Sequence, residues 1–128
     1  MMVIFYSKSK DANAKYLSNY TKTDGLIIAG SGVVTQAGNG RIHIDVAVGD
    51  VTISQELSAH GAGQIDLTAH EGAVNVNAPV SSISGAISIT GNAVHQGANI
   101  STGGTGTLVV TANTAGITMP DTVASTTD

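Results

Sequence analysis

The chain has 128 residues, with no cysteine, no tryptophan and a net charge of −4 at neutral pH. The lack of cysteine excludes a disulfide framework and a thiolate metal site. No run of 18 apolar residues is present to cross a membrane as a helix, and charged residues make up only 11% of the chain, less than in most globular domains.

The charges are distributed unevenly along the chain. All five basic residues lie within the first 41 positions, whereas residues 42–128 contain seven acids and neither Lys nor Arg. The phosphates of nucleic acids and of anionic lipids are bound by Lys and Arg. The sequence therefore argues against a nucleic-acid or lipid-surface partner for most of the chain.

Residues 1–24 carry no clear pattern and are predicted to be a separate N-terminal lead or cap. The apolar start, Met1 to Tyr6, is too short for a signal-peptide core and lacks a basic start and a cleavage site. The stretch from Tyr16 to Tyr20 could be a degenerate first strand. Residues 25–128 are predicted to form a repeat domain.

The first recognisable part of a repeat follows this lead. Leu26, Ile27 and Ile28 form one short apolar run, and Val33 and Val34 form another. These runs are predicted to be the second and third strands of an incomplete early turn.

Complete repeats begin at four glycines that stand 23, 22 and 21 residues apart: Gly40, Gly63, Gly85 and Gly106. The units begin GRIHIDVA, GQIDLTAH, GAISITGN and GTLVVTAN. Positions two, four and six after each glycine are apolar or small, so each unit opens with a strand that has one buried face. The three inward columns are Ile42, Ile65, Ile87 and Leu108, then Ile44, Leu67, Ile89 and Val110, then Val46, Ala69, Gly91 and Ala112.

Two more short strands follow in each unit. The second strand is aligned at Val51 to Ile53, Val74 to Val76, Gly116 to Thr118 and, with a looser fit, Val94 to Gln96. The third apolar position is aligned at Leu57, Val80, Ile100 and Val123.

Three short strands per unit of 21–23 residues predict one turn of a three-sided coil. We therefore expect an all-β fold, a right-handed parallel β-helix of four to five turns over residues 25–123. Stacked turns would pair each strand with its equivalents above and below and join the apolar columns into one narrow core. The alternative, an antiparallel sandwich of short strands, would not repeat with a single period.

The cadence G-x-I-x-L-x-A followed by G-x-V-x-V resembles the passenger repeats of filamentous-haemagglutinin-type adhesins, and similar cadences occur in autotransporter passengers. The resemblance covers residues 25–123. It implies a right-handed parallel β-helix in a protein secreted by a Gram-negative bacterium through an outer-membrane transporter. The secretion-signal domain of that family has no match here, so the resemblance implies a fragment of a longer protein.

Register places two files of outward side chains on the first strand. One file is His43, Asp66, Ser88 and Val109, and the other is Asp45, Thr68, Thr90 and Thr111. The first contains the residue types of a hydrolytic triad, but a triad needs His between Ser and Asp. The second resembles the Thr ladder of ice-binding coils. Asp45 and Asp66 on neighbouring turns could be a carboxylate pair of a carbohydrate-active enzyme. His70 and Glu71, which look like an acid-base pair, are predicted to form a solvated corner.

The function predicted from the sequence is structural: a rod that displays an adhesive surface outside the cell, with host glycans or proteins as partners. No residue is predicted to be catalytic, and no cofactor or metal is expected. Self-association through open coil ends is expected. The alternatives are a fragment of a β-helix polysaccharide lyase or hydrolase and, third, an ice-binding solenoid.

Overall fold

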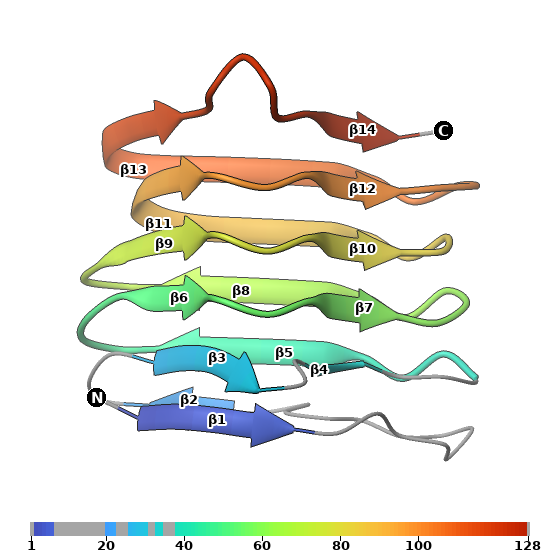
Figure 1. Ribbon diagram of the computed structural model, residues 1–128, viewed down its shortest axis with the longest axis horizontal. Coiled ribbons are helices and arrows are strands. Elements are labelled where there is room, and N and C mark those ends of the chain that lie inside the picture. The colour runs from blue at the N-terminus through green and yellow to red at the C-terminus, as the bar shows by residue number, and fades with distance from the viewer. Residues whose placement is uncertain (1, 7–19, 23–25, 31–32, 35–37, 128) are drawn as a thin grey trace.

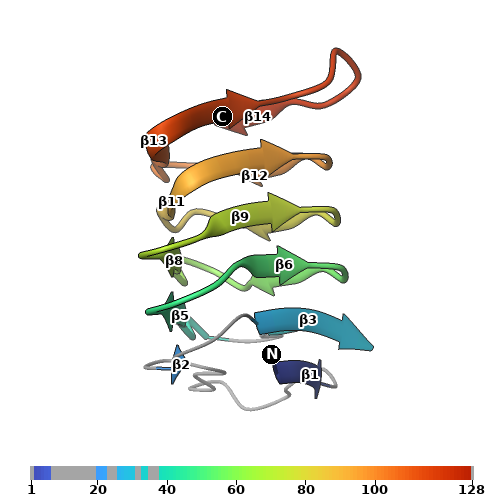
Figure 2. The same ribbon diagram turned by 90° about the vertical axis from the view of Figure 1, so that its left-hand side faces the viewer.

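The computed structural model describes residues 2–6, 20–22, 26–30, 33–34 and 38–127. Within these ranges the chain is all-β, and its strands stack in parallel as a β-solenoid of about four turns (Figure 1). The predicted fold class is confirmed. The coil has three sides, and Figure 2 shows the second strand of successive turns lying apart from the first.

Each side is a column of strands from successive turns. The first side contains β2 (Tyr20–Lys22), β5 (Ile42–Val46), β8 (Ile65–Ala69) and the first halves of β11 (Ile87–Gln96) and β13 (Leu108–Thr118). The second side contains β1 (Met2–Tyr6), β3 (Leu26–Gly30), β6 (Val51–Ile53), β9 (Ala73–Val76) and the second halves of β11 and β13. The third side contains β4 (Val33–Val34), β7 (Leu57–Ala59), β10 (Val80–Ser82), β12 (Ile100–Thr102) and β14 (Ser125–Thr127).

The coil is right-handed. In Figure 1 the chain rises from β5 to β13, running left to right along the nearer β6 and β7 and right to left along the farther β8. In Figure 2, which is turned by 90°, β6 and β9 lie to the right of β5 and β8, which is the side that faces the viewer in Figure 1. The early strands β3 and β4 pair with β6 and β7, as their predicted places in the second and third columns require.

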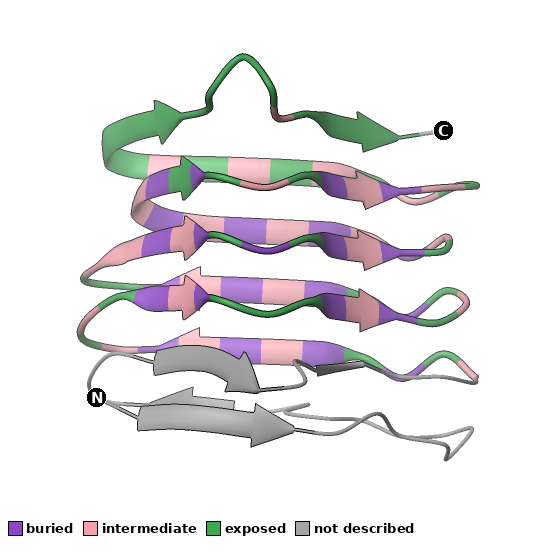
Figure 3. Cartoon of the chain, in the orientation of Figure 1, coloured by how far each residue is buried: buried purple, intermediate pink, exposed green. Residues whose placement is uncertain are grey.

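The core is the stack of inward columns predicted from the repeat. Ile42 pairs with Ile65, and Ile65 with Ile87, and all three side chains are buried. Along β5 and β8 every second residue is buried, which produces the alternating bands of Figure 3. Aliphatic side chains from all three sides meet in one cluster, so burial of apolar area stabilises the stacking of the turns.

The repeat glycines lie at a corner where backbones of successive turns touch. A Cβ on Gly63 would lie 2.4 Å from the carbonyl oxygen of Gly40, and a Cβ on Gly85 would lie 2.1 Å from that of Gly63. Real Cβ atoms do not approach a carbonyl this closely, so only glycine allows the turns to stack here. At a second corner, a Cβ on Gly72 would lie 2.1 Å from the carbonyl oxygen of Gly49.

Two register predictions for the last turn are wrong. The residue above Val94 is Ile117, not Gly116, which lies above Ala93. The third side ends with Ser125 above Ile100, rather than with Val123.

The second of these errors has a local cause. The Val123 amide donates to the carbonyl of Pro120 at 3.1 Å, which closes a turn before β14. This turn delays β14, so its first residue lies two positions beyond the predicted one.

The proposed boundary at residue 24 stays a prediction. The described strands on its N-terminal side join the coil ladders, because β1 pairs in parallel with β3 and β2 with β5. Of the stretch considered as a degenerate first strand, only Tyr20 belongs to the described residues, and it begins β2.

Candidate functional site

The first side presents two parallel files of outward side chains, as predicted. His43 pairs with Asp66 and Asp66 with Ser88, while Asp45 pairs with Thr68 and Thr68 with Thr90. Successive strands of a ladder lie about 4.8 Å apart, so these side chains are close neighbours. The charged members gather on β5 and β8, and the hydroxyl groups continue over β11 and β13.

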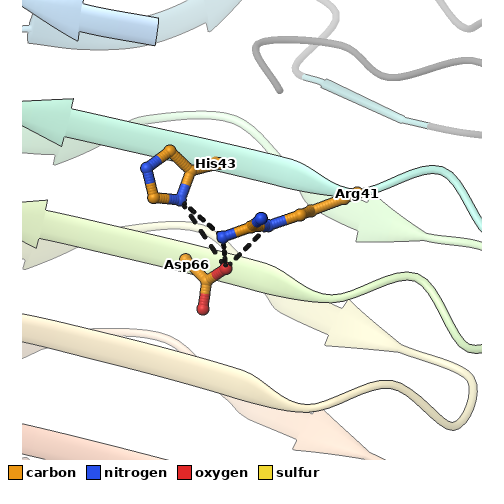
Figure 4. A network of polar contacts seen from close by, with 3 residues as sticks. All are labelled: Arg41, His43 and Asp66. Atoms are coloured by element: carbon orange, nitrogen blue, oxygen red, sulfur yellow. Dashed lines mark hydrogen bonds and ion pairs between the residues drawn. The ribbon is translucent and has the colours of Figure 1, made fainter. Parts of the chain in front are cut away.

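Arg41, His43 and Asp66 form a polar network that joins two turns (Figure 4). The Arg41 guanidinium donates to Asp66 Oδ2 from Nε at 2.9 Å and from Nη2 at 2.7 Å. Arg41 Nη2 also lies 3.0 Å from His43 Nδ1, and that nitrogen is 3.6 Å from Asp66 Oδ2. The side chain of Arg41 is 45% exposed and that of Asp66 is 25% exposed, so solvent screens the pair and limits its worth.

Asp45 and His70 make a second contact between the same two turns. Asp45 Oδ1 lies 2.7 Å from Nε2 of His70, which stands at the corner after β8. The same Oδ1 is shielded from water and has no hydrogen-bond donor aligned with it. The contact is therefore a close approach of a carboxylate to an imidazole rather than an aligned hydrogen bond. The corner is exposed, as expected, but the sequence did not reveal this partner of His70.

The triad geometry is absent from the first side. The file runs His43, Asp66, Ser88, so Asp66 stands between the other two residues. Ser88 lies two strands away from His43, about 10 Å, which is beyond hydrogen-bonding distance. In a hydrolytic triad the His accepts the proton of the Ser hydroxyl, and no such contact is possible here.

The two carboxylates considered for carbohydrate chemistry each face a basic group. Asp66 accepts two hydrogen bonds from Arg41, and Asp45 faces His70. The contact between Arg41 and Asp66 was missed from the sequence, because the two residues occupy diagonal positions on neighbouring strands. A rule that tests diagonal pairs would have found it, since long side chains reach that far.

A hydroxyl file on the third side was also missed from the sequence. It consists of the middle residues of the short strands, Ser58, Ser81, Ser101 and Thr126. The Ser81 hydroxyl donates to that of Ser58 at 3.4 Å, a long hydrogen bond. The sequence signal was available, because each of these residues follows an inward position of the third column or its structural equivalent.

The described part of the chain offers no enclosed ligand site. Its surface has no pocket. No cluster of three or more His, Asp or Glu residues within the described ranges is arranged to hold a metal ion.

The search for a membrane-spanning helix is negative over the described residues. None of their segments is a helix long and apolar enough to cross a bilayer.

Comparisons with known proteins identify no relative. No protein-family model, no curated protein and no solved structure matches this chain.

Proposed function

We propose that this coil is a structural display segment of a surface-exposed or secreted bacterial protein, in which a rigid rod presents polar side chains to an adhesive partner. One observation carries the proposal. The first and third sides of the described coil carry in-register files of polar side chains over one buried aliphatic core, and no pocket interrupts the described surface.

The solid core supports a mechanical role. Ile44, Leu67 and Ile89 stack in one column at 0% exposure, and the third side contributes Leu57 and Val80, which are equally buried. Each turn contacts only its neighbours, so the coil extends by repetition without changing its cross-section. A coil of this kind suits extension and display better than closure around a small molecule.

The outward files supply the presented chemistry. Ser and Thr hydroxyl groups both donate and accept hydrogen bonds, and the files repeat them at the spacing of the strands. Glycans and extended polar peptides carry matching donors and acceptors. The hydroxyl files on the first and third sides are therefore the surfaces proposed to meet a partner.

Surface labelling tests where the protein is displayed. Antibodies raised against the folded chain should label intact cells of the source organism. Protease added outside the cells should remove that signal. A signal that appears only after lysis would contradict display at the surface.

Binding to immobilised glycans and matrix proteins tests the adhesive part of the proposal. The variant Ser81→Lys places a long charged side chain in the middle of the third-side file and should reduce the binding that the unmodified chain shows. Thr52→Lys, on the second side and similarly half-buried, is the matched control. Equal binding by all three proteins would remove the third side from the proposal.

A further inference from the structure

The corner between the third side and the first contains an Asn-Gly step. Of the eight asparagines in the sequence, only Asn39 is followed by a glycine. Asn39 is exposed and stands just before β5, at the corner that lies at the right of Figure 1. Gly38, the residue before it, has a φ of 71°, a left-handed conformation that favours glycine. Asn39 therefore lies in a tight turn, beside a residue that has no side chain.

The side-chain amide of Asn39 is held and polarised by the turn above it. The Ala62 N–H donates to Asn39 Oδ1 at 2.9 Å. A donor at this oxygen stabilises the negative charge that forms on Oδ1 when a nucleophile adds to Cγ. The backbone nitrogen of Gly40 is the nucleophile next along the chain, and its addition to Cγ closes a succinimide ring. Gly40 has no Cβ to shield that nitrogen.

Asn99 makes the same contact but is followed by a different kind of backbone. The Ala124 N–H donates to Asn99 Oδ1 at 2.9 Å, so this amide is polarised in the same way. The next residue is the β-branched Ile100, whose N–H donates to the carbonyl of Ala124 at 3.0 Å where β12 begins. Attack on Cγ of Asn99 would require this ladder to open and the nitrogen to pass a branched side chain.

The backbone nitrogen of a repeat glycine belongs to a turn rather than to a strand. One turn above Gly40, the Gly63 N–H donates to the carbonyl of His60 at 3.1 Å and closes the turn. The Gly106 N–H does the same with the carbonyl of Gly103 at 3.0 Å. Exposed turns open at a lower free energy than paired strands. Local opening at the corner therefore brings the Gly40 nitrogen to Asn39 Cγ at a lower cost than the equivalent motion at Asn99.

We propose that Asn39 is a site of spontaneous covalent modification by deamidation. The Gly40 nitrogen loses its proton and bonds to Asn39 Cγ, the bond between Cγ and Nδ2 breaks, and Nδ2 takes up a proton from solvent and leaves as ammonia. Water then adds to either carbonyl of the succinimide and opens the ring, which leaves aspartate or isoaspartate at position 39. This inference concerns the chemistry of one corner and does not depend on the display function of the sides.

The two products differ in their effect on the stacking of turns. At another corner, Asp50 Oδ1 accepts the Ala73 N–H at 2.8 Å, so a carboxylate oxygen makes the contact that Asn39 Oδ1 makes here. Aspartate at position 39 therefore preserves the bond between turns. Isoaspartate routes the main chain through the former side chain and lengthens it by a methylene group. The corner is tightly packed, because a Cβ on Gly61 would lie 2.4 Å from Asn39 Oδ1, so the longer backbone forces the turns apart.

Mass spectrometry of the folded full chain during incubation at mildly alkaline pH tests the proposal. Asn39 should lose most of its amide, and an isoaspartyl methyltransferase should label part of the product. Asn99 is the matched control within the same molecules and should keep its amide. Conversion of Asn39 no faster than that of Asn99, or conversion that occurs only after the chain is unfolded in urea, would overturn the proposal.

Thermal melts test the difference between the two products. Asn39→Asp carries one product from the start and should melt close to the unmodified chain. The aged chain, which contains isoaspartate, should melt at a lower temperature. The methyltransferase returns isoaspartate to aspartate and should restore the melting temperature. Equal melting temperatures for the aged chain and Asn39→Asp would show that the corner accepts the longer backbone, against the effect proposed for isoaspartate.

Discussion

The turn formed by β8, β9 and β10 and the turn formed by β13 and β14 follow the same cadence but differ in burial. Ile65, Leu67 and Val74 of the interior turn are 0% exposed. Their equivalents in the last turn, Leu108, Val110 and Ile117, are partly or half exposed. Burial in a solenoid therefore depends on having a turn on each side and not on the motif alone.

The way in which strands are held also changes toward the last turn. In the interior, Val76 and Val80 are buried aliphatic residues. One turn higher, the buried Gln96 occupies the column of Val76, and its amide donates to the carbonyl of Ala124 at 2.9 Å. The Ser125 hydroxyl donates to Gln96 Oε1 at 2.8 Å. In this column, hydrogen bonds thus replace apolar contacts toward the last turn.

The largest expected effect tests this difference in burial within one column. Ile65→Asp puts a carboxylate in the middle of the apolar core with no partner, and we expect a loss of about 4 kcal/mol or more, enough to prevent folding. Leu108→Asp makes the same change at the partly exposed end of the column and should cost about 1–2 kcal/mol. Urea unfolding followed by circular dichroism measures both.

Thr90→Asp, on the outward face of the neighbouring strand, is the control for the introduced charge, because Thr90 lies between Thr68 and Thr111 rather than beside an acid. It should melt close to the unmodified chain. The inward register would be wrong if Ile65→Asp and Thr90→Asp had equal stabilities. The comparison between turns would fail if Leu108→Asp were as damaging as Ile65→Asp.

The next effect concerns the corner where turns touch. Gly85→Ala forces a Cβ against the carbonyl of Gly63, so the turns must separate locally at a cost of about 1–3 kcal/mol. Gly97→Ala is the matched control, because its Cβ would lie 3.2 Å from the nearest atom on an exposed corner. Thermal melts measure the melting temperatures of both variants. Similar values would show that the backbone at this corner can move apart at little cost in stability.

The columns of the coil could be predicted from the sequence because two simple periods coincide. Alternation within a strand selects the inward residues. A glycine marks the start of each turn, because the backbones of successive turns touch there. The pairing of Ile42 with Ile65 and of Ile65 with Ile87 could therefore be predicted from the sequence. The pairing of Asp66 with His43 followed from the same register.

The corners and the polar contacts could not be predicted as well, because neither obeys a period. Val46 and Val51 are separated by a longer corner than Gly91 and Val94, where β11 continues through the bend with a shift in register. The wrong prediction at Val123 arose because the length of the corner before β14 could not be predicted. Gln96 is a polar residue at an inward position where the pattern predicts an apolar one. Its role, which is to bond the Ala124 carbonyl just before β14, depends on a strand whose position the sequence did not predict.

A smaller effect is expected where hydrogen bonds hold the last strand. Gln96→Leu keeps the volume but removes the bonds to Ala124 and Ser125, each worth about 1 kcal/mol. We expect faster hydrogen exchange in β14 with unchanged protection in β8, since local opening is cheaper than global unfolding. Gln64→Leu, at an exposed position, is the control. Equal exchange in both variants would mean that Gln96 does not anchor the strand.

The smallest effect is expected outside the core, at the pair formed by Arg41 and Asp66. Both side chains are partly exposed, so Arg41→Gln should lower the stability by less than about 1 kcal/mol, and added salt should reduce the difference. A double-mutant cycle with Asp66→Asn isolates the coupling, because both variants keep hydrogen-bonding groups of similar size. A coupling energy as large as the loss of stability in Gly85→Ala would show that the outer polar network, and not the stacked core alone, holds the first turns together. A coupling near zero would leave Arg41 and Asp66 available to a partner at little cost to the fold.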